Sequence, residues 1–181
     1  ADVARMERLV RRSLDQVRTE PDRQSGQRCD LRAVLQDLAA RHTDEVLRIE
    51  LKLDEGPEEA AVSADTLDAI LAPLLDNARQ HGRAGRPQVR VEIRARREGS
   101  ALHIELADDG PGIPSGHAEK LFLPFFTTAR EQGGTGLGLH FARVLAESLG
   151  GSLELLSAVA PPNSADSAAA RGARFRLVLP A

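Results

Sequence analysis

Apolar and polar residues alternate over several short stretches of this chain, with the two-residue period of half-buried strands. Between 46 and 53, for example, Ile49, Leu51 and Leu53 share one face of the expected strand. Arg97-Glu98-Gly99-Ser100 separates two such stretches and predicts a hairpin turn. The expected strands are 46–53, 89–93, 102–106, 153–156 and 175–179.

Apolar residues spaced three and four apart predict helices between these strands. Asp30 and Ser63 precede two of them as suitable N-caps, and Gly150-Gly151 follows the third as a stop signal. Residues 110–134 are instead rich in Gly and Pro around one short helical stretch, and so long a loop inside a domain is usually functional. The expected helices are 31–38, 64–81 and 137–149.

This order of elements predicts an α+β fold, a two-layer sandwich with a mixed, mostly antiparallel sheet and helices on one face. We expect one domain at 31–181, after a polar linker at 19–30. Residues 1–18 have the 3-4 apolar spacing of a helix that packs on other helices. This helix is either docked on its own domain or is the end of a dimerising helical hairpin.

Composition narrows the range of partners. With 24 Lys and Arg against 27 Asp and Glu, the net charge of -3 gives no reason to expect nucleic acid or a membrane surface as partner. No apolar run is long enough to span a bilayer. Cys29 is the single cysteine, which excludes an internal disulfide and is compatible with a reducing, cytoplasmic setting.

Three groups of residues carry the candidate chemistry. Asn77 lies late in a helix, where its carboxamide oxygen can complete an octahedral Mg²⁺ shell of water and phosphate oxygens. Asp108 ends a strand, and a carboxylate there can accept from the amino group of adenine and repel the O6 of guanine. The glycines of 134–138 precede a helix, whose N–H groups and positive dipole end can bind an anion.

These residues fall in three of four segments that together resemble the N, G1, F and G2 boxes of the ATP-binding catalytic domain of sensor histidine kinases. The resemblance covers roughly residues 30–180 and implies the ATP-binding fold shared with type II topoisomerases, mismatch-repair ATPases and heat-shock chaperone ATPases. The segments are Leu74-Leu75-Asp76-Asn77-Ala78, Asp108-Asp109-Gly110-Pro111-Gly112-Ile113, Leu121-Phe122-Leu123-Pro124-Phe125-Phe126 and Gly133-Gly134-Thr135-Gly136-Leu137-Gly138-Leu139.

The resemblance implies ATP and Mg²⁺ as cofactors, with Asn77 as the metal ligand and residues 110–134 as a lid. Asn77 and Arg130 are the catalytic candidates, with Arg130 meeting the γ-phosphate. The alternative is that Arg130 is simply a solvent-exposed arginine of the lid. The candidate ATP-binding residues are Asn77, Arg79, His81, Asp108, Gly110, Gly112, Ile113, Phe122, Thr128, Gly134, Thr135, Gly136, Leu137 and Gly138.

The chain departs from the family pattern at three positions next to the first segment. Pro73 stands where many relatives have Asn or Glu, and Gln80 stands where they often have a phosphate-binding Lys. Arg79 or Arg83 can supply the positive charge that this Lys provides in relatives. The sequence alone does not indicate which of the two does so. His81 occupies a position that is commonly Tyr stacked on adenine, so it either stacks similarly or is only structural.

None of the five histidines has the acidic neighbour and nearby Pro expected of a phosphoacceptor. We therefore expect a histidine kinase fragment that transfers the γ-phosphoryl of Mg·ATP to a histidine outside this chain, upstream or on another protein. The implied partners are a response regulator and the chain's own dimerisation and phosphoacceptor domain, in a homodimer. The fragment would be cytoplasmic, either free or as part of a membrane-anchored sensor. The alternatives are a serine kinase of the anti-sigma-factor type and an ATP-binding pseudokinase or scaffold.

Overall fold

The computed structural model describes residues 27–53, 59–82, 85–129, 134–157 and 172–180. The helix expected at 1–18 lies outside the described residues, and so does most of the expected linker. The last two residues of that linker, Cys29–Asp30, form strand β1, which pairs with β3 (Glu59–Ala60) in a small separate sheet.

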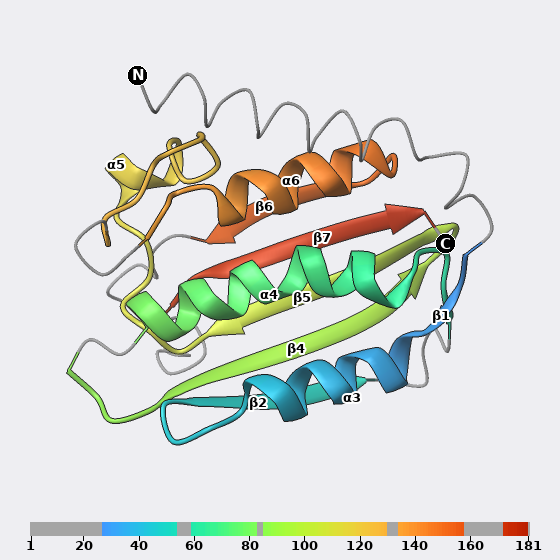
Figure 1. Ribbon diagram of the computed structural model, residues 1–181, viewed down its shortest axis with the longest axis horizontal. Helices are drawn as coiled ribbons and strands as arrows, with labels where there is room; N and C mark the ends of the chain where they lie inside the picture. Colours follow the sequence, from blue (N-terminus) through green and yellow to red (C-terminus); the bar gives the residue numbers. More distant parts are fainter. Residues whose placement is uncertain (1–26, 54–58, 83–84, 130–133, 158–171, 181) are drawn as a thin grey trace.

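A five-stranded mixed sheet forms one layer of the molecule (Figure 1). Its strand order is β2-β4-β5-β7-β6, in which β2 and β4 are parallel and every other pair is antiparallel. These pairings confirm the predicted mixed, mostly antiparallel sheet. The strands are β2 (Leu47–Leu53), β4 (Val89–Glu98), β5 (Ala101–Asp108), β6 (Ser152–Ser157) and β7 (Arg174–Pro180).

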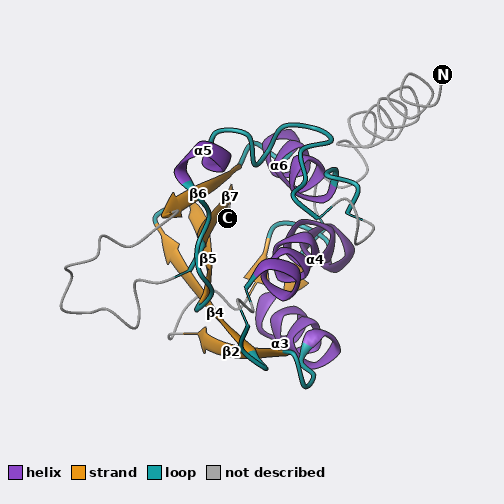
Figure 2. Ribbon diagram, turned by 90° about the vertical axis from the view of Figure 1, so that its left-hand side faces the viewer, coloured by secondary structure: helices purple, strands orange, loops and turns teal. Residues whose placement is uncertain are grey.

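Three helices form the second layer and cover one face of the sheet (Figure 2): α3 (Leu31–His42), α4 (Ala64–His81) and α6 (Gly138–Ser148). The predicted N-caps are confirmed, since Asp30 Oδ1 accepts from Ala33 N at 2.8 Å and Ser63 Oγ from Thr66 N at 3.1 Å. A one-turn helix, α5 (Ser115–Ala118), lies in the Gly- and Pro-rich loop. The predicted two-layer α+β architecture is therefore confirmed.

The core lies between the two layers and is almost wholly aliphatic. Alternate residues of the central strands face it in register, so that Ile93 pairs with Leu106 and Ile104 pairs with Leu177. The matching helix positions are three and four residues apart, as the sequence pattern predicts. The largest fully buried side chains are Leu31, Leu35, Leu38, Leu47, Leu67, Ile70, Leu71, Leu74, Leu75, Ile93, Leu102 and Ile104.

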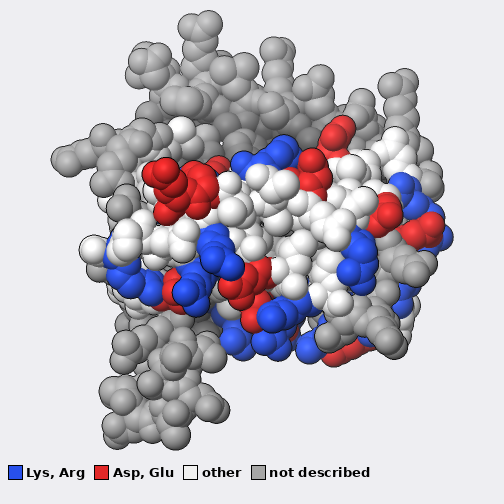
Figure 3. Space-filling view, turned by 90° about the horizontal axis from the view of Figure 1, so that it is seen from below, with Lys and Arg blue, Asp and Glu red and all other residues white. Residues whose placement is uncertain are grey.

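Charged side chains of both signs share the surface that Figure 3 presents. Arg41 on α3 illustrates the pattern, because it pairs with Asp37 at 2.8 Å and with Asp68 on α4 at 2.5 Å. Exposed pairs of this kind contribute little stability each. The second pair nevertheless joins two neighbouring helices.

Candidate nucleotide-binding site

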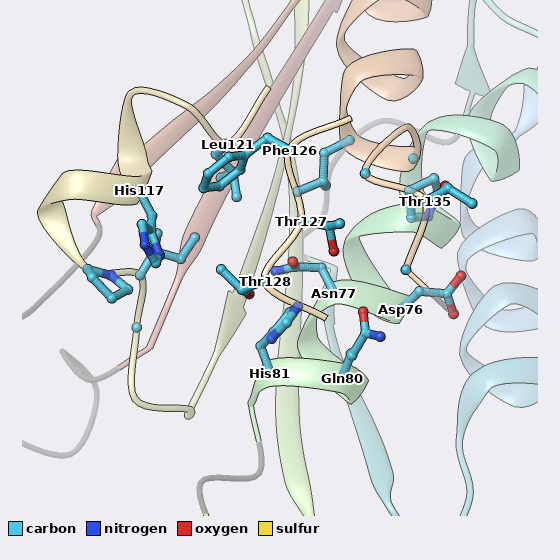
Figure 4. Close-up of a pocket in the computed structure, with 18 of the residues that line it drawn as sticks. Asp76, Asn77, Gln80, His81, His117, Leu121, Phe126, Thr127, Thr128 and Thr135 are labelled. Carbon is cyan, nitrogen blue, oxygen red and sulfur yellow. The ribbon is translucent and has the colours of Figure 1, made fainter. Parts of the chain in front are cut away.

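A cavity of about 690 Å³ opens at one end of the helical layer (Figure 4). This volume is within the usual range for small-molecule sites, roughly 300–1,000 Å³. The walls are the last two turns of α4, the start of the lid (residues 110–134), its later part, and a glycine turn (residues 134–138) that leads into α6. The lining residues are Pro73, Asp76, Asn77, Gln80, His81, Pro111, Gly112, Ile113, Pro114, His117, Leu121, Phe126, Thr127, Thr128, Gly134, Thr135, Gly136, Gly138 and Leu139.

Helix α4 presents one polar face to the cavity and one apolar face to the core. Asn77 and His81 are one turn apart and both line the cavity, as does Pro73 one turn earlier. Leu74 and Leu75 are buried on the core side. Partial burial lowers the pKa of the His81 imidazole, so this ring is uncharged at neutral pH.

Arg79 does not line the cavity. Its guanidinium is bound instead by Asp44, and it donates to the carbonyl of His42 at 2.8 Å, which ties α4 to the end of α3. The second candidate for the missing phosphate cation, Arg83, lies outside the described residues, as does Arg130. Within the described residues, the cavity is lined by no Lys or Arg.

Asp108 lies at the end of β5, as expected, immediately before the cavity wall formed by Pro111, Gly112 and Ile113. Its Oδ1 accepts from Gly110 N at 2.8 Å. Burial raises the pKa of the Asp108 carboxyl, and backbone N–H groups lower it in part. Neither Asp108 nor Gly110 is among the residues that line the cavity.

Close backbone packing fixes the end of β5. A Cβ at Gly110 would lie 2.7 Å from Gly82 Cα, so only glycine fits there. The neighbouring Asp109 accepts from Arg86 Nη1 at 3.0 Å and from Arg90 N at 2.8 Å, which anchors this strand end to the start of β4. The sequence offers no local signal for these pairs, because their partners are about twenty residues away.

The glycine turn packs against the later part of the lid. Gly136 adopts φ +68°, and a Cβ there would lie 2.5 Å from the carbonyl carbon of Phe125. Gly134 N donates to the carbonyl of Ala129 at 3.0 Å. Thr135, Gly136 and Gly138 line the cavity where α6 begins, while Leu137, the residue before α6, does not. Helix α6 therefore directs its N-terminus, with its partial positive charge, toward this wall.

The lid contributes Leu121, Phe126, Thr127 and Thr128 to the cavity (Figure 4). Phe122, which the sequence suggested as an ATP contact, does not line it. Its ring packs edge-on against Phe175 of β7, with the ring centroids 6.3 Å apart.

Sequence reasoning missed His117 as a lining residue. Its ring, on α5, meets Phe126 edge-on with the ring centroids 5.5 Å apart. No motif marks His117. The only signal was its place in the loop between two motif segments.

In the described part of the chain, no group of three or more His, Cys, Asp or Glu side chains is placed to hold a metal ion. The carboxylate and carboxamide oxygens at the cavity are those of Asp76, Asn77 and Gln80. Oxygen donors in this small number suit Mg²⁺, which usually takes one or two protein ligands and fills its shell with water and phosphate oxygens. The residues present therefore fit a metal that arrives with a nucleotide.

None of the helices among the described residues has the length and apolar character needed to cross a membrane.

The sequence of this chain is similar to those of known proteins. The family described as histidine kinase-, DNA gyrase B-, and HSP90-like ATPase matches residues 62–181. The alginate biosynthesis sensor protein KinB of Pseudomonas aeruginosa is 31% identical over 156 residues, which are 84% of this chain and 24% of KinB. Sensor histidine kinase AruS of the same species is 38% identical over 139 residues, 71% of this chain and 14% of AruS. The chain thus spans about a quarter or less of these relatives.

Solved structures of histidine kinases are also similar to this chain. The mycobacterial sensor histidine kinase MprB superposes with a TM-score of 0.65 at 26% identity, covering 85% of this chain and 97% of that one. The catalytic domain of histidine kinase ThkA has the same fold, with a TM-score of 0.65 at 20% identity over 85% of this chain and 94% of that one. The chain therefore belongs to the histidine kinase-, DNA gyrase B- and HSP90-like ATPase family, and it resembles the catalytic domain of sensor histidine kinases within it.

Proposed function

We propose that this chain binds Mg·ATP in the cavity and transfers the γ-phosphoryl group to a histidine outside the chain. The observation that carries the proposal is the convergence of all four motif segments around one cavity. Asn77 comes from α4, Gly112 from the segment after β5, Phe126 from the third segment in the lid and Gly136 from the glycine turn. This set combines a metal ligand, a base-binding wall and an anion-binding turn.

The adenine base would lie at the side of the cavity formed by His81, Gly112 and Ile113. An uncharged His81 imidazole suits stacking on a purine. Asp108 is not among the lining residues, but it lies three residues before Pro111, which is; we place its carboxylate as the acceptor of the adenine amino group, because a carboxylate accepts and does not donate. Adenine would then be preferred to guanine, whose O6 would face the same oxygens.

The phosphates would lie near the glycine turn, where backbone N–H groups and the α6 N-terminus favour an anion. The Thr127, Thr128 and Thr135 hydroxyls can add neutral donors. Asn77, with Asp76 beside it, would hold the Mg²⁺ that the nucleotide brings. Bound there, the metal would neutralise charge on the phosphates, which phosphoryl transfer requires together with correct positioning.

The whole sensor around this fragment is also part of the proposal. The names of its relatives describe sensor kinases, so the acceptor would lie on a dimerisation and phosphoacceptor domain and the final partner would be a response regulator. A homodimer of the full protein and a cytoplasmic site of action fit this arrangement.

An ATP-binding scaffold without transferase activity is the second candidate. It is favoured by the lack of Lys or Arg among the described lining residues, since a charged donor to phosphate is roughly twice as strong as a neutral one. Such a protein would bind Mg·ATP and transfer nothing.

Substitution of Asn77 tests the proposal. Asn77→Ala should abolish Mg·ATP-dependent phosphorylation of a supplied histidine phosphoacceptor domain while the circular dichroism spectrum stays unchanged. Asn77→Asp is the matched control, because it keeps an oxygen at the metal position and should retain part of the activity. Normal transfer by the Ala variant would remove Asn77 from the mechanism.

The same assay separates the alternatives. Phosphohistidine is lost in acid, whereas phosphoserine survives, so an acid-stable product would favour the serine kinase. Nucleotide binding measured by calorimetry, with no labelled product on any acceptor, would favour the scaffold. Absence of both binding and transfer would refute the proposed function.

A further inference from the structure

Phe122 is held from several sides although it does not line the cavity. The imidazole Nδ1 of His140, on α6, lies 3.0 Å from the carbonyl oxygen of Phe122. A carbonyl oxygen only accepts, so His140 Nδ1 carries the hydrogen and donates it. This bond joins α6 directly to the lid.

The side chain of Phe122 is held by two further contacts. The Arg143 guanidinium carbon lies 5.1 Å from the centre of the Phe122 ring, within cation–π range. The Phe175 ring, on β7, lies at 85° to the Phe122 ring. Arg143 is itself oriented by Glu147, whose Oε1 accepts from Nε at 2.9 Å.

The contacts of Phe122 also restrict the neighbouring lid residues that line the cavity. Leu121, immediately before it, and Phe126, four residues later, both line the cavity (Figure 4). Backbone bonds from Leu123 N to Lys120 O, 2.9 Å, and from Phe126 N to Leu123 O, 3.3 Å, link this stretch into consecutive turns. Fixing Phe122 therefore also limits where Leu121 and Phe126 can lie.

Helix α6 serves the same cavity with its first turn. Gly138 and Leu139 line the cavity, and His140 and Arg143 follow at once on the same helix. One rigid element thus carries both the end of the glycine turn and the attachment of the lid.

We propose that His140 and Arg143 are positioning residues that clamp Phe122 and so preorganise the lid over the nucleotide cavity. The clamp lowers the conformational entropy that the lid loses when a nucleotide binds. Its role in binding rests on the proposed function of the cavity, whereas the order that it imposes on the lid does not.

Two pairs of variants of the chain test the clamp. His140→Leu removes the donor and should speed amide hydrogen exchange over residues 120–128 several-fold without nucleotide. It should also weaken Mg·ATP binding by about fivefold, as expected for one lost hydrogen bond. His140→Asn can donate from a similar position and should restore most of both. Arg143→Leu should act like His140→Leu, and Glu147→Gln, which leaves the cation over the ring, should act like the wild type.

The readouts separate a clamp from general stability. If exchange in β4 and β5 rises as much as in the lid, or if His140→Asn behaves like His140→Leu, the proposal is overturned. Unchanged lid exchange in His140→Leu would overturn it as well. Should the wild-type chain bind no Mg·ATP, the proposed function fails, and lid exchange in the nucleotide-free protein still decides the clamp.

Discussion

The carboxyl group of Asp108, which we propose as the adenine acceptor, opposes folding at neutral pH. Burial raises its pKa above the ordinary value for Asp. For a raised folded pKa, the stability contribution is fully present below the unfolded pKa, near 3.9, and is lost as pH rises through the folded pKa. At neutral pH, the charged carboxylate therefore destabilises the fold.

Replacement of Asp108 by Asn should have opposite effects on stability and binding. The amide oxygen can still accept from Gly110 N, which leaves the NH₂ group to face the base. We expect Asp108→Asn to raise the thermal midpoint of the nucleotide-free protein at pH 7 and to weaken ATP binding about tenfold or more, the cost of one opposed hydrogen bond. Thermal unfolding with and without Mg·ATP measures both.

The adjacent residue provides the control. Asp109→Asn breaks the ion pair with Arg86 and should lower the thermal midpoint instead. Wild-type ATP affinity in Asp108→Asn would exclude Asp108 from base recognition.

Single elements were predicted well from the sequence, and contacts between distant elements were not. The spacing of Asn77 and His81 places both on one face of α4, and the structure has both at the cavity. The period of a helix says nothing of its neighbours, so the binding of Arg79 by Asp44, 35 residues away, was not predictable. Phe122 was expected both to pack onto the sheet or a helix and to contact ATP; it packs against Phe175 of β7 and its carbonyl meets His140 of α6, and it does not line the cavity.

The junction of α3, α4 and β2 should make stability depend on pH in strong acid. Asp44 binds Arg79 and accepts from the N–H groups of Leu47 and Val46, which lowers its pKa from 3.8 to about 2. For a lowered folded pKa, the stabilisation is present above the unfolded pKa and is lost as pH falls through the folded one. We therefore expect this contribution to disappear between about pH 4 and pH 2.

Chemical denaturation at a series of pH values measures the effect. Asp44→Asn should be less stable than the wild type at pH 6, and the difference should shrink as pH approaches 2. Asp37→Asn, which removes another exposed partner of an arginine, serves as control. A difference between Asp44→Asn and the wild type that stays constant down to pH 2 would contradict the assignment.

At the scale of the whole molecule, the strand order brings the residues just before β7 next to Asp108. Because β7 lies between β5 and β6, Asp108 N donates to Ala173 O at 3.0 Å. The next residue back, Gly172, passes so close that a Cβ there would lie 1.8 Å from Asp108 O. The sequence predicts each strand but not this order, since pairing of distant strands leaves no local period.

Substitution of Gly172 should therefore affect the nucleotide site through the sheet. Gly172 has φ +113°, and a methyl group would push on the backbone of Asp108. We expect Gly172→Ala to destabilise the fold by about 2 kcal/mol or more and to weaken Mg·ATP binding as well. Gly99→Ala is the matched control, because Gly99 also has positive φ, +57°, but a Cβ there meets nothing within 4 Å. It should cost about 1 kcal/mol from backbone strain alone and leave nucleotide affinity unchanged. If both variants showed the same thermal midpoint and the same affinity, the contact between Gly172 and Asp108 would have no part in shaping the site.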